Sequence, residues 1–209
     1  MTLLFSHRRN TVEELRATPM SYGVEVDLRS DGGELVLHHE PFSGGTSFRA
    51  WLADYDHAGL IANVKEDGLE DAVLALLAEH GVETFFFLDQ PFPTLVKTGR
   101  RGERRCAVRV SEFEPVTQAV AVADLVDWVW VDCFTRWPLR ADEVQALRDA
   151  GLRTCLVSPE LQGRLDPAEA EALARSASDV GLVPDAVCTK RPEQWESLLG
   201  PAAREQAAP

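Results

Sequence analysis

Short apolar runs alternate with amphipathic stretches along most of this chain, a pattern typical of β-strands alternating with α-helices. The clearest helix has Leu69, Val73, Leu76 and Leu77 on one face and ends before Gly81. The pattern predicts strands at residues 3–6, 23–29, 59–65, 83–88, 106–110, 128–134, 153–157 and 185–189, and helices at 69–80, 116–125, 141–150 and 166–180. Residues 91–105, which contain proline and several basic residues, are predicted to form a turn region.

Eight strands in β-α order, most of them continuously apolar, indicate a parallel sheet covered by helices. Eight such units favour a closed (β/α)8 TIM barrel, for which 209 residues is a small size. The segment 35–40 is then an extra strand within the second βα loop. The alternative is an open doubly wound sheet, but this requires a glycine-rich first turn, and the turn at residues 7–10 contains no glycine.

The sequence predicts a single domain over residues 1–200, since no linker or repeat beyond the βα alternation interrupts it. The alanine-rich residues 201–209 are expected to form a frayed tail. The four cysteines fall in four different predicted strands without zinc-site spacing, so we expect buried, reduced thiols.

The net charge of -13 argues against general affinity for nucleic acid and for anionic membranes. No stretch reaches the roughly 20 apolar residues of a membrane span, and no signal peptide is recognised at the start. We therefore expect a cytoplasmic protein. The sequence leaves the oligomeric state open and is compatible with a homo-oligomer.

Two carboxylates and two histidines form the most informative group of polar residues. Glu25 and Asp27 lie two positions apart in one strand, so they point to the same side. Two neighbouring carboxylates repel each other, and a cation is the usual remedy when they are buried. His7 and His39 follow the ends of neighbouring strands and would supply an acid and a base beside that cation. His38, adjacent to His39, is expected to face the other way.

Further polar residues occur where the predicted strands end, and in a barrel these carboxyl ends form the face that carries active sites. These residues are His7, Arg8, Glu25, Asp27, Lys65, Asp89, Arg109, Ser111, Glu112, Asp132 and Lys190.

Three separated segments resemble the glycerophosphodiester phosphodiesterase family, which belongs to the phosphatidylinositol-phospholipase-C-like barrel phosphodiesterases. They are His7-Arg8 followed by Asn10-Thr11, then Glu25-Val26-Asp27, then Asp31-Gly32 and the stretch Leu35-Val36-Leu37-His38-His39-Glu40-Pro41. The resemblance covers residues 5–41, and the rest of the chain is similar only in its βα order.

The resemblance implies cleavage of a small glycerol, polyol or sugar phosphodiester. His7 and His39 would be the acid and base, and Arg8 would hold a phosphoryl oxygen. Glu25 and Asp27 would bind a divalent ion, Mg²⁺ or Ca²⁺, as hard carboxylate oxygens suit such ions. In the family a third strand supplies another metal-binding carboxylate.

At that third position this chain has Asn63, whose carbonyl oxygen is a ligand without charge. Arg9 stands where the family commonly has glycine, and Glu40 stands in place of an aspartate. The resemblance therefore implies weaker or differently placed metal in this chain.

Other strand-end residues are candidate substrate contacts. Lys65 and Arg109 would contact phosphate, while Asp89, Glu112 and Asp132 would bind polyol hydroxyls or complete a metal shell. Trp130 or Trp137 would stack on a sugar ring. For each of them the alternative is a structural ion pair or a core aromatic residue.

Two other functions are compatible with the sequence. Asn63 favours a non-catalytic barrel that keeps the anion pocket, and Lys65 allows a lyase or aldolase that forms a Schiff base. The basic residues between Arg100 and Arg105 are either a solvated loop or a lid that attracts an anionic substrate.

Overall fold

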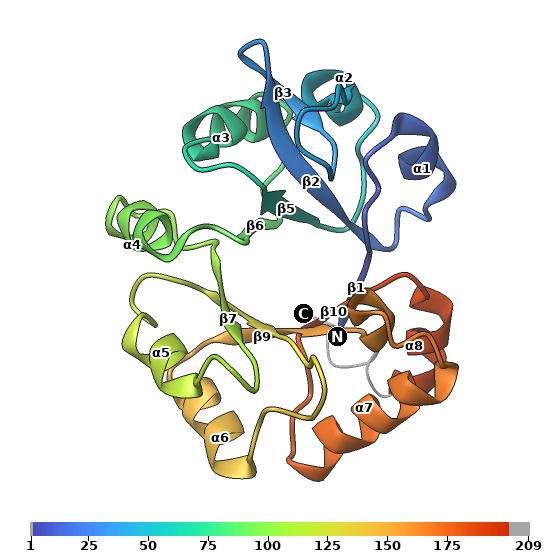
Figure 1. Ribbon diagram of the computed structural model, residues 1–209, viewed down its shortest axis with the longest axis vertical. Coiled ribbons are helices and arrows are strands. Elements are labelled where there is room, and N and C mark those ends of the chain that lie inside the picture. Colours follow the sequence, from blue (N-terminus) through green and yellow to red (C-terminus); the bar gives the residue numbers. More distant parts are fainter. Residues whose placement is uncertain (1, 201–209) are drawn as a thin grey trace.

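The computed structural model describes residues 2–200, and its centre is a curled sheet of eight parallel strands (Figure 1). The strands are β1 (Leu3–Ser6), β2 (Gly23–Asp31), β5 (Leu60–Val64), β6 (Phe85–Leu88), β7 (Ala107–Val110), β8 (Trp128–Val131), β9 (Arg153–Val157) and β10 (Ala186–Thr189). They follow one another around the barrel in chain order, and β10 pairs with β1. The predicted small (β/α)8 barrel is therefore confirmed.

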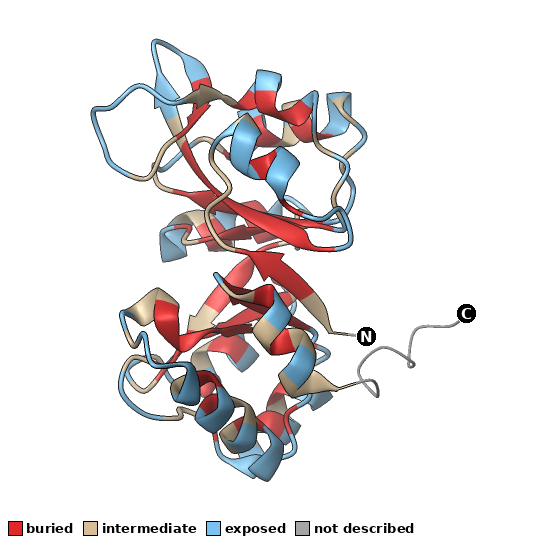
Figure 2. Cartoon of the chain, turned by 90° about the vertical axis from the view of Figure 1, so that its right-hand side faces the viewer, coloured by how far each residue is buried: buried red, intermediate tan, exposed pale blue. Residues whose placement is uncertain are grey.

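Helices surround this sheet. They are α1 (Val12–Ala17), α2 (Phe48–Leu52), α3 (Glu70–Glu79), α4 (Phe92–Arg100), α5 (Val116–Ala121), α6 (Ala141–Asp149), α7 (Pro167–Asp179) and α8 (Pro192–Leu199), with a 3-10 turn η1 (Pro159–Gln162) after β9. Figure 2 shows that the strands are buried while the outward faces of the helices are exposed. Among the described residues, no helix is long and apolar enough to span a membrane.

Two short seams divide the barrel into an upper and a lower half, which Figure 2 shows from the side. Strands β1 and β2 share only two residue pairs. Strands β6 and β7 are joined by a single bridge between Phe87 and Cys106, which the Phe87 amide reinforces by donating to the Arg105 carbonyl at 2.7 Å. The carboxyl ends of β6 and β7 are thus unpaired with each other.

The strands bury side chains on both faces, as their continuous apolar character requires. One cluster fills the barrel, where Phe86 stacks on Trp128 with ring centroids 4.6 Å apart and meets Phe5 edge-on at 5.8 Å. A larger cluster lies between the strands and the helices, with Trp51 and Trp195 fully buried in it. All four cysteines are free and buried, as predicted.

The second βα connection carries the expected extra strand. Strand β3 (Glu34–Leu37) runs antiparallel to an extended β2, and β4 (Thr46–Ser47) pairs with β3. The predicted strand ended at Glu40, but the observed one ends at Leu37, so His39 lies in the turn that follows. This turn lets His39 fold back over the end of the barrel.

Four helices, α1, α2, α4 and α8, were absent from the sequence prediction. Helix α4 occupies most of the predicted turn region 91–105; it begins after Pro91, carries Pro93 in its first turn and buries only Leu95, Thr98 and Gly99. Helices α1 and α2 have six and five residues. Segments this short contain too few apolar positions for a helical period to stand out.

The basic residues after α4 lie at the opposite end of the barrel from the candidate site, because they precede β7 rather than follow a strand. Arg104 pairs with Asp127 at 3.0 Å and donates to three backbone carbonyls, and Arg105 lies over the Phe85 ring and pairs with Glu103. The lid interpretation is therefore wrong. The predicted tail, residues 201–209, lies outside the described residues.

Candidate active site

The polar residues of the candidate site continue the rows of side chains that fill the barrel. Alternate residues of a strand face the same side. Phe5 of β1 points into the barrel, so His7 does as well, and Ile61 of β5 is followed on the same side by Asn63 and Lys65. Glu25 and Asp27 alternate with Val24, Val26 and Leu28 of the outer core and therefore face the interior together, as predicted. Polar side chains thus form the last layer at the carboxyl ends of the strands.

The turn after β1 binds Glu25 directly. The His7 amide continues the strand by donating to the Thr189 carbonyl at 2.8 Å. Arg8 then adopts a left-handed conformation with φ of 55°, which is uncommon for a residue other than glycine. The Arg8 amide donates to Glu25 Oε2 at 2.7 Å.

Glu25 has a side chain only 1% exposed and an unusual protonation equilibrium. Burial, followed by repulsion from Asp27, raises its pKa to about 7, although hydrogen bonds from Asn63 and the Arg8 amide act in the opposite direction. Near neutral pH this carboxyl group therefore exchanges a proton readily.

Asp27 is equally buried but is surrounded by donors. Its Oδ2 accepts from Asn10 Nδ2 at 3.0 Å and lies 3.1 Å from Arg8 Nε, while its Oδ1 lies 3.3 Å from His39 Nδ1 and 3.4 Å from Lys65 Nζ. Burial alone would raise its pKa, but these neighbours together lower it. Asp27 is thus the permanent negative charge of the site.

The two candidate histidines lie in different surroundings. His39 Nδ1 faces the Asp27 carboxylate and His39 Nε2 lies 3.2 Å from Arg8 Nη2, so in the neutral ring the proton is on Nδ1 and Nε2 is the acceptor. His7 Nε2 lies 3.6 Å from Glu25 Oε2. Burial, then the charges of Arg8 and Lys190, lower the His7 pKa to about 3, so His7 is neutral at physiological pH.

His38 does not join this group. Its Nδ1 lies 3.0 Å from the backbone oxygen of Glu40, and its side chain is turned away from Asp27. The expectation that His39 rather than His38 faces the carboxylates agrees with this arrangement.

Asn63 occupies the position of the missing third carboxylate. Its Nδ2 donates to Glu25 Oε1 at 2.9 Å, which leaves its own Oδ1 buried without a hydrogen-bond partner among the described residues. Glu25, Asp27 and Asn63 are all hard oxygen donors of the kind that Mg²⁺ and Ca²⁺ use. The unpartnered oxygen and the raised Glu25 pKa are both features that a bound cation would relieve, so the donor chemistry fits a divalent ion.

The described residues contain no cluster of three or more His, Cys, Asp or Glu side chains placed to hold a metal. All four oxygens of Glu25 and Asp27 already face donors of the protein itself. The site thus offers two carboxylates and one amide oxygen, one charge fewer than the family pattern.

A chain of ion pairs extends from Asp27 across the end of the barrel. Lys65 lies between Asp27 and Asp89, at 3.2 Å from Asp89 Oδ2. Arg109 bridges Asp89 and Asp132. Burial raises the pKa of Asp132 although Arg109 opposes the rise.

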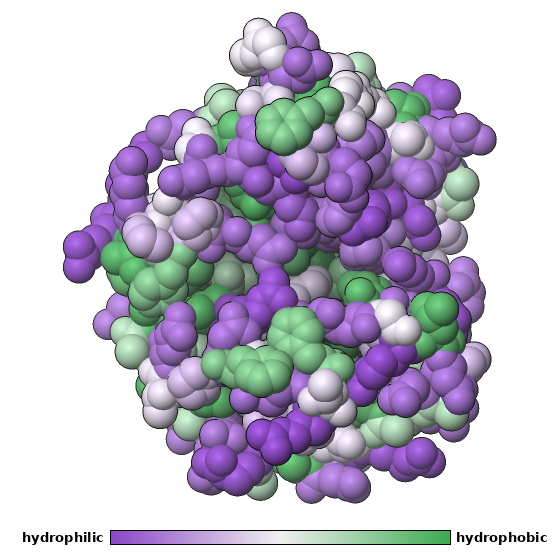
Figure 3. Space-filling view, in the orientation of Figure 1, coloured by the Kyte–Doolittle hydropathy of each residue, from purple (hydrophilic) through white to green (hydrophobic). Residues whose placement is uncertain are grey.

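The centre of this face contains a cavity of about 120 Å³, roughly the share of four water molecules. Hydrophilic side chains border the hollow in the middle of Figure 3. The cavity is lined by His7, Arg8, Glu25, Asn63, Lys65, Leu88, Asp89, Arg109, Trp130, Asp132, Val157, Leu161 and Gln162. Most of the residues proposed from the sequence therefore meet at one place.

Asp27 and His39 do not line this cavity themselves but contact Arg8, which does. Two further candidates lie elsewhere. The Glu112 carboxylate accepts from the amides of Phe134, Thr135 and Arg136, so it fixes the loop after β8 rather than lining the cavity. Trp137 packs against the outer core. Trp130 does line the cavity, with a ring 4% exposed beneath the polar layer.

Two site residues were not identified from the sequence as contributors. Asn10 both donates to Asp27 and accepts from the Asp27 amide at 2.9 Å, which fixes the carboxylate in place. Gln162, from the 3-10 turn, donates to Asp132 Oδ1 at 2.7 Å. Neither lies in a strand, so strand periodicity carries no signal for them.

The fold and this polar layer define the class of protein: a (β/α)8 barrel with a cluster of carboxylate, imidazole and basic side chains at the carboxyl ends of its strands. Among solved structures, the chain is similar to a glycerophosphodiester phosphodiesterase from Agrobacterium tumefaciens, with a TM-score of 0.63 and 15% identity over 95% of this chain and 99% of that one.

It is also similar to a glycerophosphoryl diester phosphodiesterase from Parabacteroides distasonis, with a TM-score of 0.66 and 11% identity over all of this chain and 88% of that one. A phosphoribosylanthranilate isomerase from Thermotoga maritima aligns with a TM-score of 0.56 and 14% identity, covering 98% and 99% of the two chains. No family model and no curated protein sequence matches the chain. At these identities the likeness establishes the fold alone.

Proposed function

We propose that this barrel is a divalent-metal-assisted phosphodiesterase that cleaves a small glycerol, polyol or sugar phosphodiester. The observation that carries the proposal is the convergence of His7, Arg8, Glu25, Asp27 and His39 on one end of the barrel, from three separated segments of the chain. The likeness of the fold to two phosphodiesterases supports it.

Each chemical requirement of phosphodiester cleavage has a candidate group. His7 is neutral and offers an unprotonated ring nitrogen to the attacking water or substrate hydroxyl, with a lowered pKa that makes it a weaker base than an ordinary histidine. His39, oriented by Asp27, would donate a proton from its doubly protonated ring to the oxygen of the leaving alcohol and would be left as the neutral ring. Arg8 has a side chain 41% exposed, so its guanidinium is accessible to a phosphoryl oxygen. The phosphorus–oxygen bond to the leaving alcohol breaks as the new bond to phosphorus forms.

The charges of the site explain why a cation is part of this proposal. Four carboxyl groups, of Glu25, Asp27, Asp89 and Asp132, lie beside three basic side chains, of Arg8, Lys65 and Arg109. The charge of Lys190 also acts on His7, but Lys190 forms no ion pair with these carboxyl groups. A phosphodiester is itself an anion, and an excess of negative charge would repel it.

A divalent ion held by Glu25, Asp27 and Asn63 would supply positive charge against the non-bridging phosphoryl oxygens. The raised pKa of Glu25 makes a proton the alternative source of neutralisation when no ion is bound.

A second function, anion binding without turnover, is favoured by one observation: every oxygen of Glu25 and Asp27 already faces a donor of the protein. The Lys65 Schiff-base alternative needs a neutral amine, whereas Lys65 lies in ion pairs with Asp27 and Asp89, so this arrangement lends it no support.

The test is product formation from a panel of glycerol, polyol and sugar phosphodiesters in Mg²⁺, Ca²⁺ or EDTA. We expect metal-dependent turnover that His39→Ala reduces by at least about 100-fold, the usual contribution of a general acid or base. His38→Ala is the matched control, because its ring hydrogen-bonds a backbone oxygen rather than Asp27, and it should retain activity. Folded protein that turns over no member of the panel would favour the binding function.

A further inference from the structure

A phosphodiester held in the central cavity must extend beyond it. The cavity of about 120 Å³ is large enough for a phosphoryl group but not for both alcohols of a diester as well. Two regions border the cavity where the rest of such a ligand could lie. One is the seam between β6 and β7, and the other is the rim beside His7, where β1 and β10 end.

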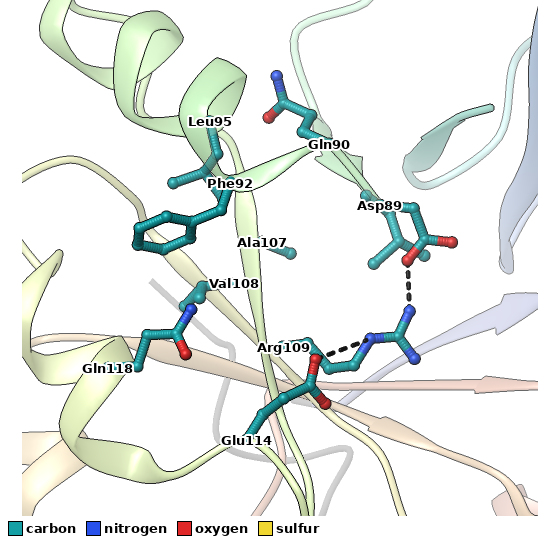
Figure 4. A pocket seen from close by; sticks show the side chains of 10 residues that line it. Asp89, Gln90, Phe92, Leu95, Ala107, Val108, Arg109, Glu114 and Gln118 are labelled. Atoms are coloured by element: carbon teal, nitrogen blue, oxygen red, sulfur yellow. Dashed lines mark hydrogen bonds and ion pairs between the residues drawn. The ribbon is translucent and has the colours of Figure 1, made fainter. Parts of the chain in front are cut away.

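The seam is an acidic region. Beyond their single bridge the two strands separate and leave a second cavity of about 230 Å³ between the strands, α4 and α5 (Figure 4). Its charged residues are Asp89, Arg109 and Glu114. Figure 4 shows Arg109 between the two carboxylates, with Nη2 paired to Asp89 and Nε at 3.9 Å from Glu114 Oε1. An anionic group in the seam would therefore meet two carboxylates and a single base that is already paired.

The rim beside His7 carries a cation, Lys190. In the pairing of β1 with β10, Phe5 lies opposite Cys188, and both side chains fill the barrel. His7 and Lys190 follow two residues later, and the His7 amide continues the ladder by donating to the Thr189 carbonyl at 2.8 Å. Since alternate residues of a strand face the same side, Lys190 lies beside His7 at the mouth of the barrel.

Lys190 differs from the other basic residues of the site in having no carboxylate to neutralise it. Arg8, Lys65 and Arg109 each pair with at least one carboxylate. Within residues 2–200, Lys190 forms no ion pair, and the residue is exposed. Its charge still acts inside the site, because it contributes, after burial and Arg8, to the lowered pKa of His7.

A buried carboxylate fixes the backbone at Lys190. Glu160, in the 3-10 turn η1 after β9, is only 4% exposed. Its Oε1 accepts from the Lys190 amide at 2.8 Å and from Thr189 Oγ1 at 2.6 Å, and its Oε2 accepts from Ser158 Oγ. Both oxygens are thus engaged by other donors. The Lys190 backbone is held in place while its ammonium group keeps the capacity to bind a ligand, which lowers the ordering cost of that contact.

We propose that Lys190 binds a carboxylate carried by one of the two alcohols of the substrate. The inference rests on the proposed function and narrows its substrate to diesters with a second negative charge. Lys190 does not line the central cavity, so its contact would be with a group on the alcohol rather than with the phosphoryl oxygens. A single ammonium group matches the one charge of a carboxylate, whereas a phosphate monoester carries nearly two.

The test compares glycerophosphoserine with glycerophosphoethanolamine, two diesters that differ by one carboxylate. They are titrated calorimetrically, in Mg²⁺, into the intact protein carrying His39→Ala, in which we expect binding without rapid cleavage. Lys190→Gln, which removes the charge, and Lys190→Arg, which keeps it, are then added to this parent. Lys97→Gln is the matched control, because Lys97 is exposed on α4 and lines neither cavity.

We expect Lys190→Gln to weaken binding of glycerophosphoserine roughly fivefold, the upper end for an ion pair open to solvent, and to leave binding of glycerophosphoethanolamine unchanged. Lys190→Arg and Lys97→Gln should bind both diesters as the parent does. Equal weakening of both diesters, unchanged affinity for both, the same loss in Lys97→Gln, or binding of neither diester would overturn the proposal.

Kinetics with His39 in place separate this inference from the proposed function. Because Lys190 also acts on His7, the measured quantity is the ratio of kcat/KM for the two diesters, in which an effect common to both cancels. Lys190→Gln should lower the preference for glycerophosphoserine roughly fivefold.

Turnover of both diesters with a ratio that Lys190→Gln does not change would overturn the carboxylate site and leave the phosphodiesterase intact. Binding that selects glycerophosphoserine through Lys190, in a protein that cleaves no diester of the panel, would support the carboxylate site and leave anion binding without turnover as the function.

Discussion

Replacing Glu25 by Gln tests the electrostatic argument for the site most directly. The folded protein raises the pKa of this carboxyl from 4.5 to about 7, through burial first and Asp27 second. A group with a raised pKa contributes its full stability below 4.5, and that contribution is lost as the pH rises to about 7. Since one pKa unit corresponds to about 1.4 kcal/mol, the wild type should lose roughly 3 kcal/mol from this group between pH 4.5 and 8.

The free energy of unfolding of the variant should not show this decrease, because glutamine has the shape of glutamate and no charge. Its amide oxygen can accept from the Arg8 amide in place of Glu25 Oε2. Its amide nitrogen would face Asn63, whose unpartnered Oδ1 becomes an acceptor when the Asn63 amide turns over. Both hydrogen bonds are thereby retained, so the substitution isolates the charge.

The assay is urea denaturation of both proteins at several pH values from 4.5 to 8.5, with the free energy of unfolding taken by linear extrapolation. The quantity of interest is the difference between the two proteins, because His7 imposes an opposite trend on both: its lowered pKa makes stability fall as the pH drops from 6.5 toward 3. We expect the free energy of unfolding of Glu25→Gln, relative to that of the wild type, to rise steadily up to pH 7 and to stay constant above it.

Glu112→Gln is a control with the opposite dependence of stability on pH, and for this variant the series is extended below pH 4.5. Burial opposes the shift, but hydrogen bonds from the loop after β8 lower the Glu112 pKa to about 2, so this residue loses its contribution as the pH falls below 4.5. A difference between wild type and Glu25→Gln that stays constant with pH, or that shrinks as the pH rises, would refute our account of the buried pair. Added Mg²⁺ or Ca²⁺ at pH 8 should stabilise the wild type more than Glu25→Gln.

Three further predictions concern the metal, the packing and the basic loop. Asn63→Glu restores the third carboxylate and should tighten Ca²⁺ binding at least roughly tenfold by calorimetry; unchanged affinity would show that Asn63 is not a ligand. A methyl group at Gly99 would lie 2.4 Å from the Leu125 carbonyl oxygen, so Gly99→Ala should lower the free energy of unfolding by about 1–3 kcal/mol, and a Tm equal to the wild type would contradict this contact. Arg104→Ala removes bonds to Asp127 and to backbone carbonyls and should lower Tm while leaving kcat/KM unchanged; a loss of activity in folded protein would revive the lid interpretation.

The strand pattern predicted the barrel because the continuous apolar character of each strand indicates that the strand is buried on both faces. Runs such as residues 85–88 and 128–131 are buried on both faces, and the structure forms parallel strands at both. Helix α4 was missed because its proline and basic residues indicated a turn region, although its apolar and polar residues are well segregated on the helix. The strand at 35–40 was placed correctly but ended too late, because chain direction at a turn depends on backbone torsions that composition does not specify.

The candidate site likewise has features that the sequence predicted and features that it did not. That Glu25 and Asp27 share a face follows from the two-residue period of a strand, and that His39 rather than His38 faces them agrees with the same alternation. Glu112 was assigned to the substrate because it follows a strand, yet its position in the loop directs it to the amides of residues 134–136. Asn10 was named from the sequence only as part of a motif, and its hydrogen bond to Asp27 is seen only in the tertiary structure.

The sequence by itself determined the order of βα units, the shared face of Glu25 and Asp27, and the end of the barrel where most of the polar strand-end residues gather. These features depend on local periods and chain direction. Only the tertiary structure decided that Arg109 bridges Asp89 and Asp132, that Asn63 turns its nitrogen to Glu25, and that β6 and β7 separate to leave a cavity. Those features depend on register and spacing between strands far apart in the chain, which no local pattern encodes.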